Sequence, residues 1–150
     1  MRREGFTLLE TLIVLVVVGL MLSIGLPKIR SALQKTNVRS ARVSFGGAAA
    51  RARATALARG CLTTVNYTSG TAGRVWVTTC KVSGVGTDTV GPVELLAARY
   101  SVSIASATSS LQYDPRGISL GFQPRTVSFT STTGNVKDST MINELGRVVR

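Results

Sequence analysis

The sequence contains no histidine and only two cysteines, Cys61 and Cys80, among its 150 residues. Because histidine is absent, the commonest general base is missing and a Ser-His-Asp arrangement is excluded. Two cysteines without histidine cannot supply an ordinary four-ligand zinc site. The glycine-rich stretch SGVGTDTVG (83–91) lacks the lysine and hydroxyl ending of a phosphate-binding loop. We therefore expect no enzyme, no catalytic residues, no metal site and no cofactor.

Acidic residues are also scarce. None occurs between Glu10 and Asp88, and the formal net charge of the chain is +11. The cations in that interval are Lys28, Arg30, Lys35, Arg39, Arg42, Arg51, Arg53, Arg59, Arg74 and Lys81. Such a positive field attracts phosphates or anionic lipids. A basic run can equally be a solvated helix face, and the sequence leaves both readings open.

The most prominent feature present is an apolar run from Phe6 to Leu26, in which Glu10 is the only charged residue. A helix of about 20 residues spans the roughly 30 Å of a bilayer's hydrocarbon core. The run is too long for the apolar part of a secretory signal peptide, and no small-residue cleavage site follows it. A plain signal anchor remains the alternative interpretation.

The start of this run, GFTLLE (residues 5–10), resembles the type IV prepilin motif. The resemblance implies that prepilin peptidase cuts between Gly5 and Phe6, removing the leader peptide 1–5. Phe6 would then be N-methylated and would keep its positive charge. Glu10 would occupy the glutamate position of the family, where the carboxylate is thought to meet the Phe amino group of a neighbouring subunit. A buried carboxylate is tolerated only with such a partner.

The resemblance also implies a location and a set of partners. We expect a bacterial inner-membrane protein that crosses once, with its C-terminal domain in the periplasm. Its partners would be other pilin or pseudopilin subunits, prepilin peptidase and an inner-membrane assembly platform. The charge count points the other way, because more cations follow the run than precede it, and the positive-inside rule would leave the body in the cytoplasm.

Beyond the apolar run, the sequence predicts an α+β chain. The helix is expected to cover 6–59, with 6–26 as the transmembrane or filament-core part and Gly60 as its terminal cap. Ile29, Val43, Ala50 and Ala54 would pack on a small antiparallel sheet formed by a β domain at 60–150. Alternating runs predict strands at 61–67, 74–80, 94–106, 117–122, 125–131 and 140–150, with loops at 83–92, 114–117 and 132–138.

The first two of these strands would form a hairpin that carries both cysteines. If Tyr67 lies opposite Arg74, then Cys61 lies opposite Cys80. Directly opposed residues of antiparallel strands have Cα atoms about 4.5–5.5 Å apart, which a disulfide accepts. The pattern favours a Cys61–Cys80 disulfide, and hence an oxidising compartment, over two free thiols.

Two further stretches, YDPRG (113–117) and the terminal GRVVR (146–150), resemble the FimT/GspH group of minor pilins and pseudopilins. Members of this group serve the pseudopilus of type II secretion or the tip of a type IV pilus. We therefore expect a structural, priming or tip subunit of one of these filaments.

Some FimT-type pilins bind DNA during natural transformation through a C-terminal Gly-Arg-x-Arg pattern, which supplies an alternative function. Here Arg147 and Arg150 are one residue further apart than in that pattern. Arg116 and Arg125 could join them in contacting phosphates. The stacking candidates would be Tyr113, Phe122 and Phe129. The two terminal arginines could instead be charges that protect an edge strand from aggregation.

Overall fold

The computed structural model describes residues 7–121 and 124–149. The chain divides into an N-terminal unit that ends at Leu33 and a body from Gln34 onward. One helix, α1 (Leu8–Arg59), belongs to both units, and Pro27 lies inside it without interrupting it. The helix ends where the sequence predicts, because Gly60 follows with a φ of 62°, the left-handed conformation of a helix cap.

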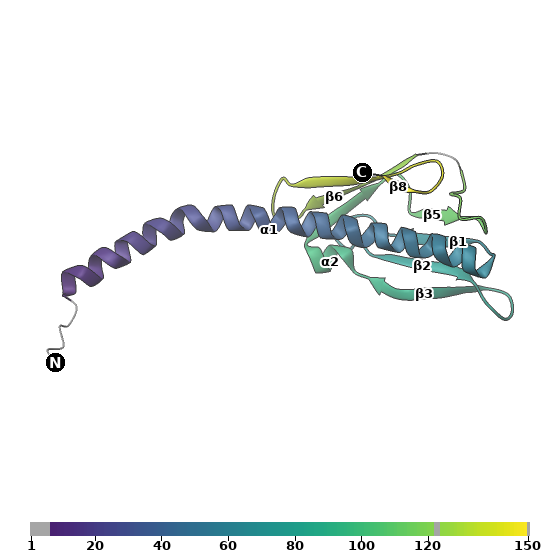
Figure 1. Cartoon of the computed structure of the whole chain (residues 1–150), viewed down its shortest axis with the longest axis horizontal. Coiled ribbons are helices and arrows are strands. Elements are labelled where there is room, and N and C mark those ends of the chain that lie inside the picture. Colours follow the sequence, from purple (N-terminus) through teal and green to yellow (C-terminus); the bar gives the residue numbers. More distant parts are fainter. Residues whose placement is uncertain (1–6, 122–123, 150) are drawn as a thin grey trace. The chain divides into compact units, whose positions relative to one another are not determined.

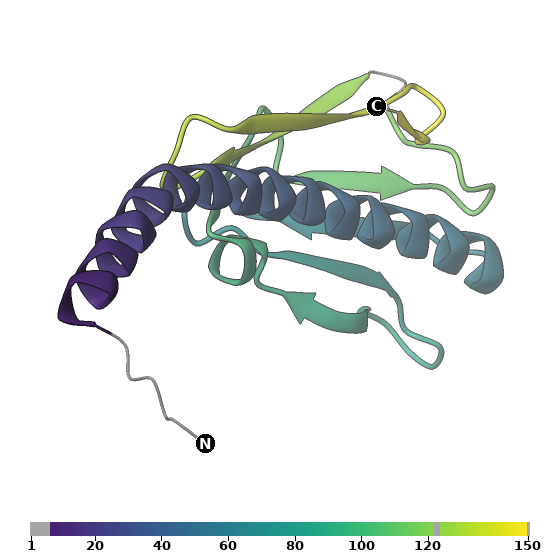
Figure 2. The same ribbon diagram turned by 60° about the vertical axis from the view of Figure 1, so that its left-hand side comes forward.

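The body contains two four-stranded antiparallel sheets and one short helix (Figures 1 and 2). The first sheet has the order β3-β2-β1-β5 and the second the order β4-β6-β7-β8. In chain order after α1, the elements are β1 (Thr63–Tyr67), β2 (Val75–Cys80), β3 (Thr87–Glu94), α2 (Leu96–Tyr100), β4 (Val102–Ser106), β5 (Ser110–Tyr113), β6 (Arg125–Ser131), β7 (Lys137–Ile142) and β8 (Val148–Val149). The α+β class and the long N-terminal helix are as predicted, although the strands form two sheets.

Several predicted elements differ in detail. The stretch predicted as one strand at 94–106 is split by α2, which ends at Ser101 with a φ of 51°. The predicted loop at 83–92 contains most of β3. In the described part of the predicted strand at 117–122, the only strand pairing is an isolated bridge between Ser119 and Tyr113. Strand β5 lies outside the predicted ranges and β7 only partly inside one. Both are short and rich in polar residues, so their alternation signal is weak.

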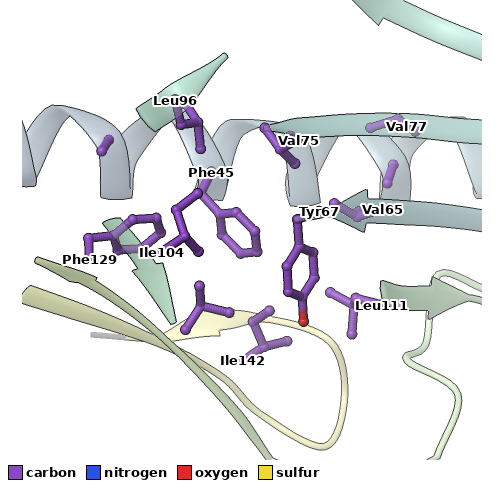
Figure 3. Close-up of a cluster of buried hydrophobic side chains, with 14 of the residues drawn as sticks. Phe45, Val65, Tyr67, Val75, Val77, Leu96, Ile104, Leu111, Phe129 and Ile142 are labelled. Atoms are coloured by element: carbon purple, nitrogen blue, oxygen red, sulfur yellow. The ribbon is translucent and has the colours of Figure 1, made fainter. Parts of the chain in front are cut away.

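The core lies between the second half of α1 and the two sheets (Figure 3). Phe45 projects from α1 between them, and its ring lies 5.3 Å from that of Tyr67 in the first sheet and 5.8 Å from that of Phe129 in the second. Both ring pairs have the edge-to-face geometry that aromatic pairs prefer. The other buried residues of α1 are Val38, Ala41, Ala48, Ala49, Ala52 and Ala56.

The face of α1 that packs on the sheets is not the predicted one. Ile29, Val43, Ala50 and Ala54 are all exposed. The buried set, from Val38 to Ala56, recurs at intervals of three and four residues and defines a different stripe of the same helix. Alanine is abundant on both stripes, so hydrophobic periodicity alone could not separate them.

Candidate functional site

The N-terminal unit presents apolar side chains on every side of α1. All described residues from Thr7 to Leu33 are exposed except Gly25, which is half-buried. They include Leu15, whose exposed fraction is 72%, and many other large aliphatic residues. By length and composition, this part of α1 is apolar enough to cross a membrane.

Glu10 lies in the first turn of α1 and is exposed. Its backbone N–H donates to the hydroxyl of Thr7, with a distance of 3.3 Å between Glu10 N and Thr7 Oγ1. This contact satisfies one of the free amide groups at the helix start. Gly5 and Phe6 lie outside the described residues, so the cleavage site, the methylation site and the Glu10 pairing stay predictions.

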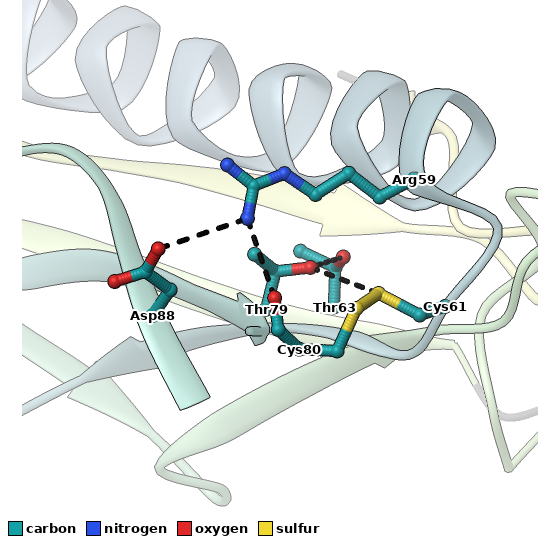
Figure 4. A network of polar contacts seen from close by, with 6 residues as sticks. All are labelled: Arg59, Cys61, Thr63, Thr79, Cys80 and Asp88. Atoms are coloured by element: carbon teal, nitrogen blue, oxygen red, sulfur yellow. Dashed lines mark hydrogen bonds and ion pairs between the residues drawn. A yellow bond between two sulfur atoms is a disulfide. The ribbon is translucent and has the colours of Figure 1, made fainter. Parts of the chain in front are cut away.

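The junction between α1 and the first sheet is closed by a disulfide between Cys61 and Cys80, as predicted (Figure 4). The predicted register is wrong by one residue, because Tyr67 pairs with Val75 and Thr63 with Thr79. Cys61 therefore precedes β1, and its Cα lies 6.2 Å from that of Cys80. This separation is still within the range of a disulfide.

A polar network surrounds the disulfide. The Cys61 sulfur lies 3.3 Å from Thr79 Oγ1, which shares a hydrogen bond with Thr63 Oγ1 at 2.9 Å. Arg59 Nη1, at the end of α1, donates to the Cys80 carbonyl at 3.3 Å and lies 4.0 Å from Asp88 Oδ2 (Figure 4). The end of the helix is thus held to β2 and β3 by one covalent and two polar contacts.

Two further arginines of α1 are tied to acids of the body. Arg42 Nη1 lies 3.2 Å from Asp138 Oδ2 of β7, and Arg51 Nη2 lies 3.1 Å from Glu94 Oε1 of β3. Ser44 donates to the second oxygen of Glu94. Sequence reasoning missed these pairs because the partners are far apart in the chain and nothing local links them.

The DPRG turn holds Arg116 close to Asp114. Asp114 accepts hydrogen bonds from the backbone N–H groups of Ile118 and Arg116 and from Arg116 Nε. These bonds, led by that from Ile118, hold the pKa of the Asp114 carboxyl below its usual range. The Arg116 side chain is nevertheless 81% exposed, so the rest of its guanidinium faces solvent.

Of the other residues predicted to contact DNA, some are accessible in the structure and some are not. Arg125 is committed to the protein backbone, since its Nη1 donates to the Ser110 carbonyl at 2.6 Å. Arg147 is exposed, while Arg150 lies outside the described residues. The predicted stacking residues Tyr113 and Phe129 are fully buried and cannot stack on a base; Phe122 also lies outside the described residues.

Tyr113 instead anchors the turn at residues 143–147 between β7 and β8, which we call the C-terminal turn. Its hydroxyl donates to the Gly146 carbonyl at 2.9 Å. Gly146 has a φ of 76°, and a Cβ at this position would lie only 2.5 Å from Tyr113 Cε1, so this position requires glycine. Burial raises the pKa of Tyr113 to about 12, and the positive charge of Arg53 opposes part of this rise.

Within residues 7–121 and 124–149, no cluster of three or more acidic or cysteine side chains could hold a metal ion.

Comparison with known proteins agrees with this description. Residues 1–26 match the family described as the prokaryotic N-terminal methylation motif. A comparison with curated proteins finds no match. Among solved structures, the fold is similar to that of the type IV minor pilin FimU of Pseudomonas aeruginosa, with a TM-score of 0.62, 11% sequence identity, and 76% of this chain and 87% of that chain covered. The chain therefore carries the N-terminal methylation motif at residues 1–26, and its fold is similar to that of a type IV minor pilin.

Proposed function

We propose that this protein is a minor pilin or pseudopilin that acts as a structural, priming or tip subunit of a type IV pilus or a type II secretion pseudopilus. The observation that carries the proposal is that the N-terminal segment has both a methylation motif and a fully exposed apolar surface. The methylation motif covers residues 1–26, and large apolar side chains of the same segment are exposed all around α1. Exposed apolar surface of this extent requires a membrane or neighbouring subunits to cover it.

In this proposal, prepilin peptidase removes residues 1–5 and the new amino terminus at Phe6 is methylated. The chain waits in the inner membrane with its body in the periplasm, where the oxidising environment supports the Cys61–Cys80 disulfide. The assembly platform then moves it into the filament. There the helices of neighbouring subunits replace lipid around residues 8–26.

Glu10 has a specific role in this step. A carboxylate surrounded by apolar helices is strongly unfavourable unless a cation and hydrogen bonds compensate it. The methylated ammonium of Phe6 on a neighbouring subunit would supply that charge. The pair would set the axial position of each incoming subunit, because a shift along the filament would leave both charges unpaired.

The test compares Glu10→Ala with Glu144→Ala, which removes an exposed acid of the body, in the full chain expressed in its host. We expect Glu10→Ala to reduce the amount of this subunit in sheared filaments at least tenfold, and Glu144→Ala to leave it unchanged. Mass spectrometry of the natural subunit should show a methylated Phe6 at the amino terminus. Normal incorporation of the Glu10→Ala chain, or an intact leader, would contradict the proposal.

DNA binding in natural transformation is the second candidate function. One observation favours it: Arg116 and Arg147 are both exposed. Arg116 lies in the DPRG turn and Arg147 directly follows Gly146, and both turns come close to Leu57 of α1. Leu57 packs against Gly117 and also borders Gly146 and Arg147. Two exposed arginines there could contact phosphates without reading sequence.

A mobility-shift measurement with the full chain in detergent micelles tests this candidate. Several phosphate contacts predict an affinity that falls steeply between about 50 and 200 mM salt. Arg147→Gln should lower the affinity, while Arg74→Gln, on another part of the body, should not. Absence of binding at the lower salt concentration would exclude the DNA function.

A further inference from the structure

A shallow groove runs along the outward face of α1 in the body, with a volume of about 530 Å³. One wall is formed by Ala50, Arg53 and Leu57 of α1, and the other by Gly146, Arg147 and Val148 of the C-terminal turn and β8. We call it the C-terminal groove. Apart from its two arginines, it is lined by apolar side chains and glycines, so it combines an apolar floor with two positive charges.

Arg53 is the unusual residue of this groove. Its Nε is buried, yet it has no hydrogen-bond partner among the described residues. Its stem lies close to Gly117, where an added Cβ would be 3.2 Å from Arg53 Cγ and 3.1 Å from Leu57 Cγ. Buried polar groups are almost always satisfied, so the unpaired Nε marks Arg53 as a cation that the body does not compensate.

Five other arginines of the described body are paired within the chain, and Arg39, Arg74, Arg99 and Arg147 are exposed to solvent, whereas Arg53 is half-buried. Arg42, Arg51, Arg59 and Arg116 each pair with a carboxylate. Arg125 donates to a backbone carbonyl. Arg53 lines an open groove beside a second arginine and has no acid within reach in the described part of the chain.

A second copy of this chain is a poor occupant, because its own acids are already in use. Asp88, Glu94, Asp114 and Asp138 are all in ion pairs. In the described body only Glu144 is left, against a formal net charge of +11 for the chain. Two such bodies would repel each other at this face. Charge complementarity therefore calls for a different chain that carries acids.

Nucleic acid is also a poor match for the groove itself. Single-stranded nucleic acid is held by aromatic stacking platforms combined with cations, and no aromatic side chain lines the groove. Arginine is enriched at protein interfaces, and an apolar floor beside it is surface that a protein partner could bury.

We propose that the C-terminal groove binds a segment of an unlike, acidic protein subunit, whose apolar side chains lie along Ala50, Leu57 and Val148 and whose carboxylate pairs with Arg53. The identity of the partner as a filament subunit rests on the proposed function, whereas the chemistry of the groove does not. The interaction would make this protein a connector between unlike subunits.

The test is selection from a display library of random 12-residue peptides on the full chain in detergent micelles. Three variants are selected in parallel: Arg53→Gln, which keeps length and polarity, Ala50→Trp, which fills the groove, and Arg39→Gln, which removes an exposed arginine of α1 that does not line it. We expect the natural chain and Arg39→Gln to enrich peptides that place Asp or Glu next to apolar residues.

The affinity of each selected peptide is then measured for the natural chain and for each variant. Arg53→Gln and Ala50→Trp should each weaken binding at least tenfold, as should replacing the peptide's acid by its amide. Equal binding to all variants, selection without acids, or no selection would overturn the inference. Displacement of the peptide by oligo-dT of 12 nucleotides, lost in Arg53→Gln, would assign the groove to nucleic acid instead. Filament incorporation that depends on Glu10 would still stand in each case, so failure of the groove is distinguishable from failure of the proposed function.

Discussion

Residues 8–33 and 34–59 of α1 belong to one continuous helix, but they differ in side-chain size and in burial. Residues 8–33 carry large aliphatic side chains, all of them exposed in the single chain. Residues 34–59 carry mainly alanine on the buried face, with Phe45 as the only large aromatic residue. In the body, most of the large buried side chains come from the sheets, and the helix packs against them through small alanine side chains. In the N-terminal unit, the helix itself carries the large apolar side chains, and nothing in the described chain buries them.

Hydrophobicity and burial are therefore separate properties of the two stretches of this helix. The more hydrophobic stretch has no buried residue, whereas the alanine-rich stretch forms one side of the core. A helix that is apolar all around is completed by lipid or by other helices. The following experiments test whether this division between the two stretches holds, and all use the full chain in micelles. Trp76, the only tryptophan, lies in β2, so its fluorescence reports on the unfolding of the body.

The largest effect is expected for Phe45→Ala. Phe45 is fully buried between two aromatic rings, and such truncations cost about 3–5 kcal/mol. Urea unfolding should show this loss in the free energy of unfolding of the body. The matched change Leu15→Ala in the first stretch should lower the same quantity by less than about 0.5 kcal/mol. Similar losses for both would show that the two stretches are not energetically separate.

Removal of the disulfide is expected to have the next largest effect. Cys61 and Cys80 are separated by 19 positions, and closing a loop of this length contributes about 3 kcal/mol through the unfolded state. The double variant Cys61→Ala/Cys80→Ala should therefore unfold at a lower urea concentration. Reductant should destabilise the natural chain to a similar extent and leave the variant unchanged. If reductant has no effect on the natural chain, the end of the second stretch is held mainly by its polar contacts.

The stability of the body at alkaline pH tests whether Tyr113, which packs beside residues 34–59, is buried away from water. Burial raises the pKa of Tyr113 from its ordinary 10.0 to about 12, so the folded state keeps this proton after the unfolded chain has lost it. Stability is fully present below pH 10 and falls as pH rises toward about 12, by roughly 2–3 kcal/mol in total. Tyr113→Phe should show a flatter stability profile over this window. An identical slope in the variant would mean that other groups cause the loss.

Overpacking should give the smallest effect and the sharpest contrast within one helix. Ala52 is fully buried and Ala54 is exposed, two positions along α1. Ala52→Leu should destabilise the body by about 1–3 kcal/mol because the added methyl groups have no space. Ala54→Leu should change the free energy of unfolding by less than about 0.5 kcal/mol. A comparable loss for both variants would show that the buried face has been assigned incorrectly.

Much of this organisation could be predicted from local signals. The apolar run, the helix end at Gly60 and the disulfide each depend on a short stretch of sequence or on one hairpin. The register predicted for that hairpin differs from the observed one by one residue, because Cys61 lies just before β1 and still forms the disulfide with Cys80. A disulfide tolerates this offset, so the cysteines alone could not fix the register.

The rest depended on long-range contacts. The choice of alanine stripe is made by the sheets, and the pairs Arg42–Asp138 and Arg51–Glu94 join distant parts of the chain. The same holds for Arg53, since its lack of a partner only becomes visible when the C-terminal turn and Gly117 are placed around it. Tyr113 and Phe129, expected as stacking residues, were taken up by the core, which the sequence could not show.

The continuity of α1 also has a mechanical consequence. A tensile force on the N-terminal stretch is passed along the helix backbone to the buried residues between Val38 and Ala56. Because these residues all lie on one helix, a pull along its axis loads their contacts in parallel. Contacts loaded in parallel resist more force than contacts that separate one after another, so pulling this helix out of the body would require many of its contacts to break together.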